Sequence, residues 1–169
     1  MSKNLRLRRL TAAALLAAFC YVATTFLRIP TVLGYINLGD AFVLLGGGLL
    51  GPLYGGLAGG IGSGLSDLFG YPQYAPVTLV LKGAMGLLLG VFARWAAKRP
   101  TLTATLLRLL GAVLAELVMI GGYLAYETVL YGFGAAVAAV PFNALQGAVG
   151  ILLFMLLFPL LDKPFRKRI

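Results

Sequence analysis

The sequence predicts an all-α membrane protein with six transmembrane helices, both termini in the cytoplasm, and a short glycine-rich hairpin as helices two and three. Apolar residues make up 60% of the chain and charged residues 11%, whereas a soluble domain carries roughly 25% charge. Apolar blocks lie at 10–27, 38–69, 76–93, 102–126 and 141–161. Several approach the roughly 20 residues that cross a bilayer, so we expect one polytopic domain over residues 1–169.

Lysine and arginine gather in three clusters, at 3–9, 94–108 and 163–168. Because such residues stay on the cytoplasmic side of a membrane, the chain must cross an even number of times between clusters. The first and third blocks are single spans, so the second block crosses twice, and the last two blocks supply the remaining pair. The same rule explains the net charge of +9 without a nucleic-acid partner.

The first block follows basic residues, as the apolar part of a signal peptide does. It is long enough to span a membrane, so we expect an uncleaved first helix. Two overlapping A-x-x-x-A pairs, Ala13 with Ala17 and Ala14 with Ala18, give this helix a face of small residues. Such a face favours contact with another helix, either of this chain or of a partner.

The second block carries glycines four apart at Gly47, Gly51, Gly55 and Gly59. On a helix this spacing places them along one stripe, where neighbouring backbones can touch. Pro52 directly after Gly51 predicts a tight turn between two helices. Each arm then has about fifteen residues, which is short for a membrane span, so we expect protein rather than lipid around it.

Four polar side chains fall inside the last three spans. Lys82 lies about six residues, or roughly 9 Å, from the outer end of its span, and Glu116 lies near the middle of the next. Asn143 and Gln146 are three apart and share a helix face. A charge inside a membrane costs about 2.5–3.5 kcal/mol. We therefore predict that these residues line one binding pocket. In it, Glu116 accepts a hydrogen bond from an amino or hydroxyl group of the ligand, and the amides of Asn143 and Gln146 bond to its ring heteroatoms or hydroxyls. Lys82 faces an anionic or acceptor atom of the ligand.

Structural roles for the same residues stay open. Lys82 and Glu116 would neutralise each other as a buried pair, or Lys82 would snorkel toward the surface. Asn143 and Gln146 would form an interhelical hydrogen bond. Tyr123 lies seven residues after Glu116 and on about the same face; it would stack on a ligand ring or belong to the interfacial belt.

More polar residues border the outer ends of the spans: Asn37, Asp40, Asp67 and Tyr74. We expect them at the rim of the pocket. Asp40 stands early in its helix, so a cap or a contact with the helix dipole is its simpler role.

Three external connections follow from this topology, at 28–37, 70–75 and 127–140. Prolines and tyrosines in the first two predict ordered loops that cap a cavity. The third is equally consistent with a plain connector, and its residues 135–140 are candidates to extend the last helix outward. Arg28, Glu127 and Asp162 are interpreted as residues at the membrane boundary.

Cys20 is the only cysteine, and the chain has no histidine. These absences exclude an internal disulfide, metal sites built from histidine or cysteine, and an imidazole base. The P-loop pattern G-x-x-x-x-G-K-[ST] does not occur either. We expect no enzymatic activity, no cofactor and no metal.

Two segments, INLGDAFVLLGGGLLGPLYGGLAGGIGSGLSDLFG and YAPVTLVLKGAMGLLLG, resemble the substrate-binding S components of energy-coupling factor (ECF) vitamin transporters. The six spans and the A-x-x-x-A pair add to the resemblance, which covers nearly the whole chain. The second segment, with its proline and K-G-x-x-G, looks closest to the branch of hydroxymethylpyrimidine, vitamin B6 and riboflavin-type members. Scarce tryptophan argues against the tryptophan-lined pocket of thiamine-binding members.

The resemblance implies a high-affinity vitamin binder of the prokaryotic plasma membrane without its own motor. It also implies a T component and two ATPase subunits as partners, and toppling of the subunit in the membrane. By this analogy the alanine face of the first helix docks the partners, and the four buried polar residues line the pocket.

A pyridine or pyrimidine vitamin, either vitamin B6 or hydroxymethylpyrimidine, is the expected substrate. Riboflavin is the alternative within the family. A membrane scaffold without a ligand and a secondary transporter are the alternatives outside it.

Overall fold

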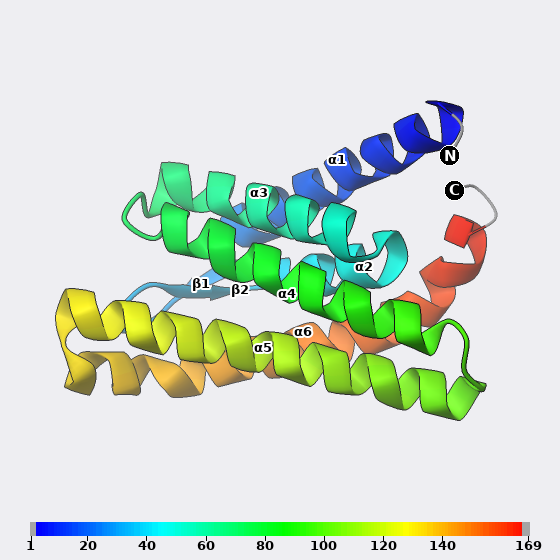
Figure 1. Cartoon of the computed structure of the whole chain (residues 1–169). Coiled ribbons are helices and arrows are strands. Elements are labelled where there is room, and N and C mark those ends of the chain that lie inside the picture. Colours follow the sequence, from blue (N-terminus) through cyan, green and yellow to red (C-terminus); the bar gives the residue numbers. More distant parts are fainter. Residues whose placement is uncertain (1–2, 167–169) are drawn as a thin grey trace.

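The computed structural model describes residues 3–166 as six helices and a two-stranded sheet. The elements are α1 Lys3–Phe26, β1 Arg28–Pro30, β2 Tyr35–Asn37, α2 Gly39–Leu50, α3 Pro52–Gly70, α4 Ala75–Ala96, α5 Thr101–Tyr131 and α6 Phe133–Arg166. The start of α1 and the end of α6 lie at the same end of the bundle, as an even number of crossings requires (Figure 1). Within residues 3–166, four helices are long and apolar enough to cross a membrane: α1, α4, α5 and α6.

Helix α2 is the centre of the bundle. It has only 12 residues and packs against α1, α3, α4 and α6. Val43, Leu44 and Leu45 along it are at most 1% exposed, so protein surrounds this short helix as expected. By contrast, α3 presents apolar side chains such as Leu53 and Phe69 on the outer surface.

The predicted turn between α2 and α3 is confirmed. Gly51 has φ +82°, a conformation that side chains disfavour, and Pro52 opens α3. Beyond the turn, the glycine stripe brings backbones together: a Cβ on Gly55 would lie 2.5 Å from the Cα of Gly47, and one on Gly90 would lie 2.4 Å from the nitrogen of Pro52. The stripe therefore packs α2, α3 and α4 tightly, the role predicted for it.

The first external connection is an antiparallel pair of strands, β1 and β2, with Arg28 opposite Asn37 and Pro30 opposite Tyr35. We refer to residues 28–37 as the hairpin. It lies between the ends of α1 and α2 and contacts α6. An ordered connection was predicted here, but three-residue strands show no periodicity from which to recognise them.

The third connection is much shorter than predicted. Helix α5 continues to Tyr131 and α6 begins at Phe133, with Gly132 at φ +87° as the single residue between them. The outward extension of the last helix over 135–140 is confirmed. Glu127 therefore lies in the last turns of α5 instead of in a loop.

Candidate functional site

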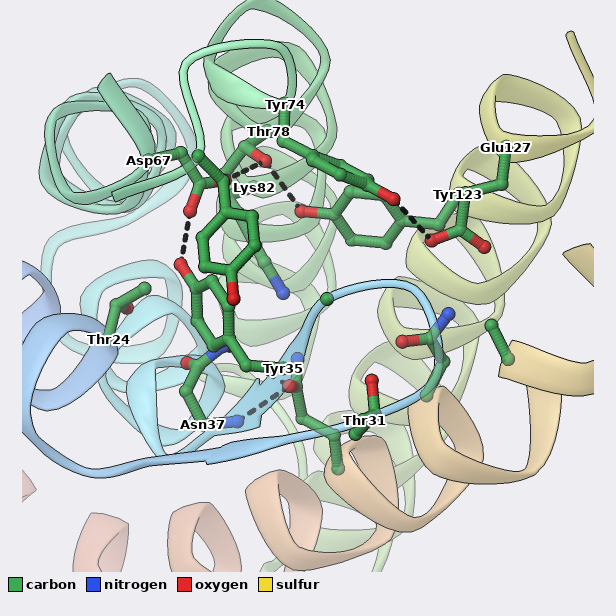
Figure 2. A pocket seen from close by; sticks show the side chains of 15 residues that line it. Thr24, Thr31, Tyr35, Asn37, Asp67, Tyr74, Thr78, Lys82, Tyr123 and Glu127 are labelled. Atoms are coloured by element: carbon green, nitrogen blue, oxygen red, sulfur yellow. Dashed lines mark hydrogen bonds between the residues drawn. The ribbon is translucent and has the colours of Figure 1, made fainter. Parts of the chain in front are cut away.

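A polar cavity lies beneath the hairpin (Figure 2), and the hairpin lies away from the end of the bundle where the two termini meet (Figure 1). Its volume is about 40 Å³, enough for about three waters at 10–15 Å³ each. Its lining comes from every helix except α2, and from the hairpin: Thr24, Thr31, Gly34, Tyr35, Asn37, Asp67, Tyr71, Tyr74, Thr78, Lys82, Tyr123, Glu127, Ala139, Asn143 and Gln146. Because polar groups are costly inside an apolar bundle, this cavity is the candidate binding site.

One wall of the cavity is organised around Asp67, near the end of α3. Its carboxylate accepts hydrogen bonds from the hydroxyls of Tyr35 and Thr78, the second at 2.5 Å. Thr78 Oγ1 also lies 2.8 Å from the hydroxyl of Tyr123. Burial and the neighbouring Asp67 carboxylate raise the pKa of Tyr35 above its usual range, so this phenol is the donor at neutral pH. The contact ties the hairpin to α3.

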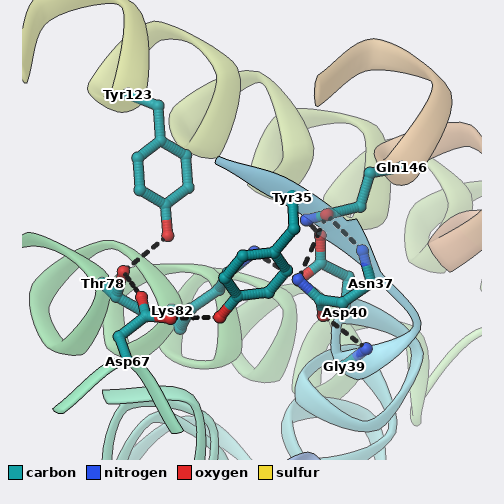
Figure 3. Close-up of polar contacts among 9 residues, drawn as sticks. All are labelled: Tyr35, Asn37, Gly39, Asp40, Asp67, Thr78, Lys82, Tyr123 and Gln146. Carbon is teal, nitrogen blue, oxygen red and sulfur yellow. Dashed lines mark hydrogen bonds and ion pairs between the residues drawn. The ribbon is translucent and has the colours of Figure 1, made fainter. Parts of the chain in front are cut away.

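A second network lies deeper and joins four elements (Figure 3). Lys82 on α4 forms an ion pair with Asp40 on α2, whose other oxygen accepts a hydrogen bond of 2.6 Å from Gln146 Nε2. Gln146 Oε1 accepts a hydrogen bond of 2.8 Å from the backbone N–H of Asn37. The Asn37 side chain in turn accepts from the N–H of Gly39 at 2.7 Å. The hairpin is thereby linked to the charge pair at the centre of the bundle.

The ion pair corrects two expectations. Lys82 forms its ion pair with Asp40 and none with Glu116 among the described residues. The side chain of Asp40 makes no capping hydrogen bond, because Leu38 occupies the N-cap position of α2; Asp40 does stand in the first turn, so its contact with the helix dipole stays a prediction.

Glu116 lies outside the cavity lining. Its side chain is 3% exposed, and neither carboxylate oxygen has a hydrogen-bond partner among residues 3–166. Gly147 and Gly150 of α6 make room for it, since a Cβ on either would lie 3.0–3.1 Å from its carboxylate. A direct contact between Glu116 and a ligand stays a prediction.

The far side of the cavity contains a second acidic residue. Glu127 is 5% exposed, and its Oε1 lies 3.2 Å from the hydroxyl of Tyr74. The same hydroxyl lies 3.0 Å from the backbone carbonyl of Leu33 in the hairpin. Figure 2 shows Thr24 and Glu127 on opposite sides of the cavity. Thr24 Oγ1 is also buried and has no partner in the described part of the chain.

Most residues predicted for the site do come together around the cavity: Lys82, Asn143, Gln146, Tyr123, Tyr74, Asn37 and Asp67. Asp40 and Glu116 lie below it. Sequence reasoning missed Thr24, Thr31 and Thr78 and treated Glu127 as a boundary residue. Helix spacing carried a signal for two of these, because Thr78 precedes Lys82 by four residues and Glu127 follows Tyr123 by four.

The alanine face of α1 divides into two pairs. Ala13 is 6% exposed and packs toward α3, whereas Ala14 and Ala18 are exposed. All four predicted alanines border an apolar groove of about 600 Å³ between α1 and α3, together with side chains such as Tyr54 and Phe69.

Comparison with known proteins gives consistent results. Residues 4–163 match the family described as "ECF-type riboflavin transporter, S component". An uncharacterized protein of Pyrococcus woesei is 43% identical over 134 residues, 78% of this chain and 86% of that protein. The thiamine precursor transporter HmpT of Lactococcus lactis subsp. cremoris is 31% identical over 94 residues, 56% of this chain and 49% of that protein.

The fold is also similar to a solved structure. The S component for biotin of an ECF-type ABC transporter superposes with a TM-score of 0.66 over 95% of this chain and 94% of that one, at 19% identity. At that identity the likeness concerns the fold alone.

Proposed function

The chain belongs to the ECF transporter S-component family, and from that premise we propose that it binds a pyridine or pyrimidine vitamin, hydroxymethylpyrimidine or vitamin B6. An S component is the substrate-binding subunit of a vitamin transporter. It works with a T component and ATPases and is not itself an enzyme. The substrate class and the residues that bind it are the proposed part.

The observation that carries the proposal is the small polar cavity closed by the hairpin. At about 40 Å³ it has room for about three waters, so any vitamin has to displace the hairpin or side chains of the lining, and a three-ring flavin has to displace more of them than a single ring. Tyrosine rings, amides and carboxylates around it suit a flat heterocycle with several hydrogen-bonding groups. The 31% identity to a thiamine precursor transporter supports the same class.

Equilibrium binding to the purified subunit tests the proposal. Calorimetry suits this protein, because its only tryptophan, Trp95, lies on the α4 segment near the opposite end of the bundle and would not report on the cavity. We expect hydroxymethylpyrimidine or a form of vitamin B6 to bind, and mass spectrometry to find the same compound retained through purification. Binding of riboflavin instead would favour the substrate named in the family description.

Two further outcomes would overturn the proposal more deeply. A scaffold would bind no B vitamin, and Lys82→Ala and Glu116→Ala would change its stability alone. A secondary transporter would take up its substrate in vesicles without ATP or partner subunits.

The apolar groove beside α1 is the proposed contact with the T component. Ala14 and Ala18 are its exposed small residues and let a partner helix approach closely. Placement in the plasma membrane with both termini in the cytoplasm is part of the same proposal, supported by the basic clusters at the ends and at the connection between α4 and α5.

A further inference from the structure

Glu127 is a buried carboxylate with hydrogen-bonding capacity to spare. It lines the cavity, is 5% exposed, and has no partner for Oε2 among residues 3–166. A carboxylate accepts up to about four hydrogen bonds, and a buried acceptor without a donor is costly. The free oxygen therefore needs a hydrogen-bond donor, and the described part of the protein does not supply one.

The hydrogen bond that Glu127 receives within the described part of the chain comes from a shared donor. The Tyr74 hydroxyl has a single proton, and two acceptors compete for it: Glu127 Oε1 at 3.2 Å and the Leu33 carbonyl at 3.0 Å. When the proton serves the hairpin carbonyl, the carboxylate has none. Tyr74 therefore serves at most one oxygen of Glu127 and leaves Oε2 without a donor.

The cavity offers Glu127 no cation either. Lys82 is the only basic residue among the described residues of the lining, and Asp40 holds its ammonium group in an ion pair. The other acid of the lining, Asp67, already accepts from two hydroxyls, those of Tyr35 and Thr78. Of the two carboxylates that face the cavity, only Glu127 has an unoccupied oxygen.

We propose that Glu127 determines specificity by accepting a hydrogen bond from an amino group, or from a protonated nitrogen, of a single-ring heterocycle. The proposal rests on the proposed function and narrows its substrate class to aminated rings. A site built to hydrogen-bond such a group rejects the analogue that lacks it, because the buried carboxylate is then left without a partner. Glu127 takes the role that the sequence had suggested for Glu116.

The test compares paired ligands on paired variants. Calorimetry measures hydroxymethylpyrimidine in its amino form against the same ring with hydrogen in place of the amino group, and pyridoxamine against pyridoxal. In the wild type, loss of the amino group is expected to weaken binding about 10–100-fold, as for a hydrogen bond to a charged group. In Glu127→Gln, the ratio of the affinities for the aminated and the non-aminated ring should fall by at least about fivefold, because the amide carbonyl is a weaker acceptor than the carboxylate. We call this ratio the gap.

Asp162→Asn is the matched control. It makes the same acid-to-amide change near the end of α6, remote from the cavity, and should keep the wild-type gap. Folding of each variant is followed by the reaction of Cys20, 0% exposed, with a thiol dye on heating. The comparison of ligands on the wild type needs no variant, so equal affinities there overturn the proposal even if Glu127→Gln fails to fold.

Each result bears on a different claim. Equal affinity for aminated and non-aminated rings in the wild type overturns the role of Glu127, and so does a gap that persists in Glu127→Gln. In both cases the binding of single-ring vitamins stands. If the wild type binds none of these single rings, the proposed function fails, and the role of Glu127 fails with it.

Discussion

Asp40 and Glu116 are two buried carboxylates that share the space beside Gly150, where a Cβ would lie 3.0 Å from Asp40 Cβ and 3.0 Å from Glu116 Oε1. Asp40 has Lys82 and Gln146 as partners, whereas the oxygens of Glu116 form no well-aligned hydrogen bond in the described part of the chain. A buried charge is tolerated when it is paired and is costly when it is not. The same chemical change should therefore have opposite effects at the two positions.

Glu116→Gln is expected to keep or raise the unfolding temperature, because it keeps the side-chain volume and removes an acid whose two oxygens have no hydrogen-bond donor in the described part of the chain. Asp40→Asn is the contrasting variant: it leaves Lys82 buried without a counter-charge and should cost about 3–5 kcal/mol. Reactivity of Cys20 during heating measures both. A large loss of stability in Glu116→Gln would mean that its carboxylate has a structural partner.

At the residue scale, the sequence identified the buried polar residues but not their pairing. Lys82 and Glu116 were both recognised as charges inside spans, yet the lysine pairs with Asp40. The basic clusters predict an even number of membrane crossings between them, but they do not predict which helices lie side by side. Glu127 was interpreted as a boundary residue, because the sequence at the end of an apolar run does not reveal whether the helix stops there or continues for another turn.

Among the elements, the seam between α2, α3 and α4 provides a sharp test of glycine packing. Gly55→Ala puts a methyl group about 2.5 Å from the backbone of Gly47, so we expect a loss of about 1–3 kcal/mol from overpacking. Gly83→Ala is the matched control on α4, since its nearest neighbour would be 3.6 Å away. It should be neutral or slightly stabilising, because alanine favours a helix over glycine. Equal effects of the two would contradict the packing role.

The alanine face of α1 predicts a separation of assembly from binding. Ala18→Leu fills the groove between α1 and α3 and is expected to abolish co-purification with the T component and the ATPases, while vitamin binding by the isolated subunit is unchanged. Ala125→Leu, at an exposed position of α5, is the control and should assemble normally. Normal assembly of Ala18→Leu would place the docking surface elsewhere.

Helix boundaries were largely predictable, and for physical reasons. Pro52 after Gly51 marks a turn that few other residue pairs permit, and long apolar runs set the spans. The strands of the hairpin and the extra turns of α5 were not predictable. Both depend on tertiary contacts, the Tyr35 hydroxyl with Asp67 and the cavity contact of Tyr74 with Glu127.

For the whole molecule, topology follows from the basic clusters and can be tested with single cysteines. Replacing Cys20 with alanine leaves a background without cysteine. Introduced cysteines at Gln73 and Gly134, at one end of the bundle, should react with a membrane-impermeant maleimide on intact cells, whereas one at Arg99 should react only after lysis. Labelling of Arg99→Cys on intact cells would reverse the proposed orientation.

The glycine seam has a mechanical consequence. Packed helices usually rearrange by moving side chains from one set of grooves into another, but where Gly47, Gly55 and Gly90 meet their neighbours there are no side chains to move. The seam has no second arrangement of comparable density, so α2, α3 and α4 should behave as one solid block. Any opening of the cavity must then come from the hairpin and from α5 and α6, the walls that pack through side chains instead of through backbone.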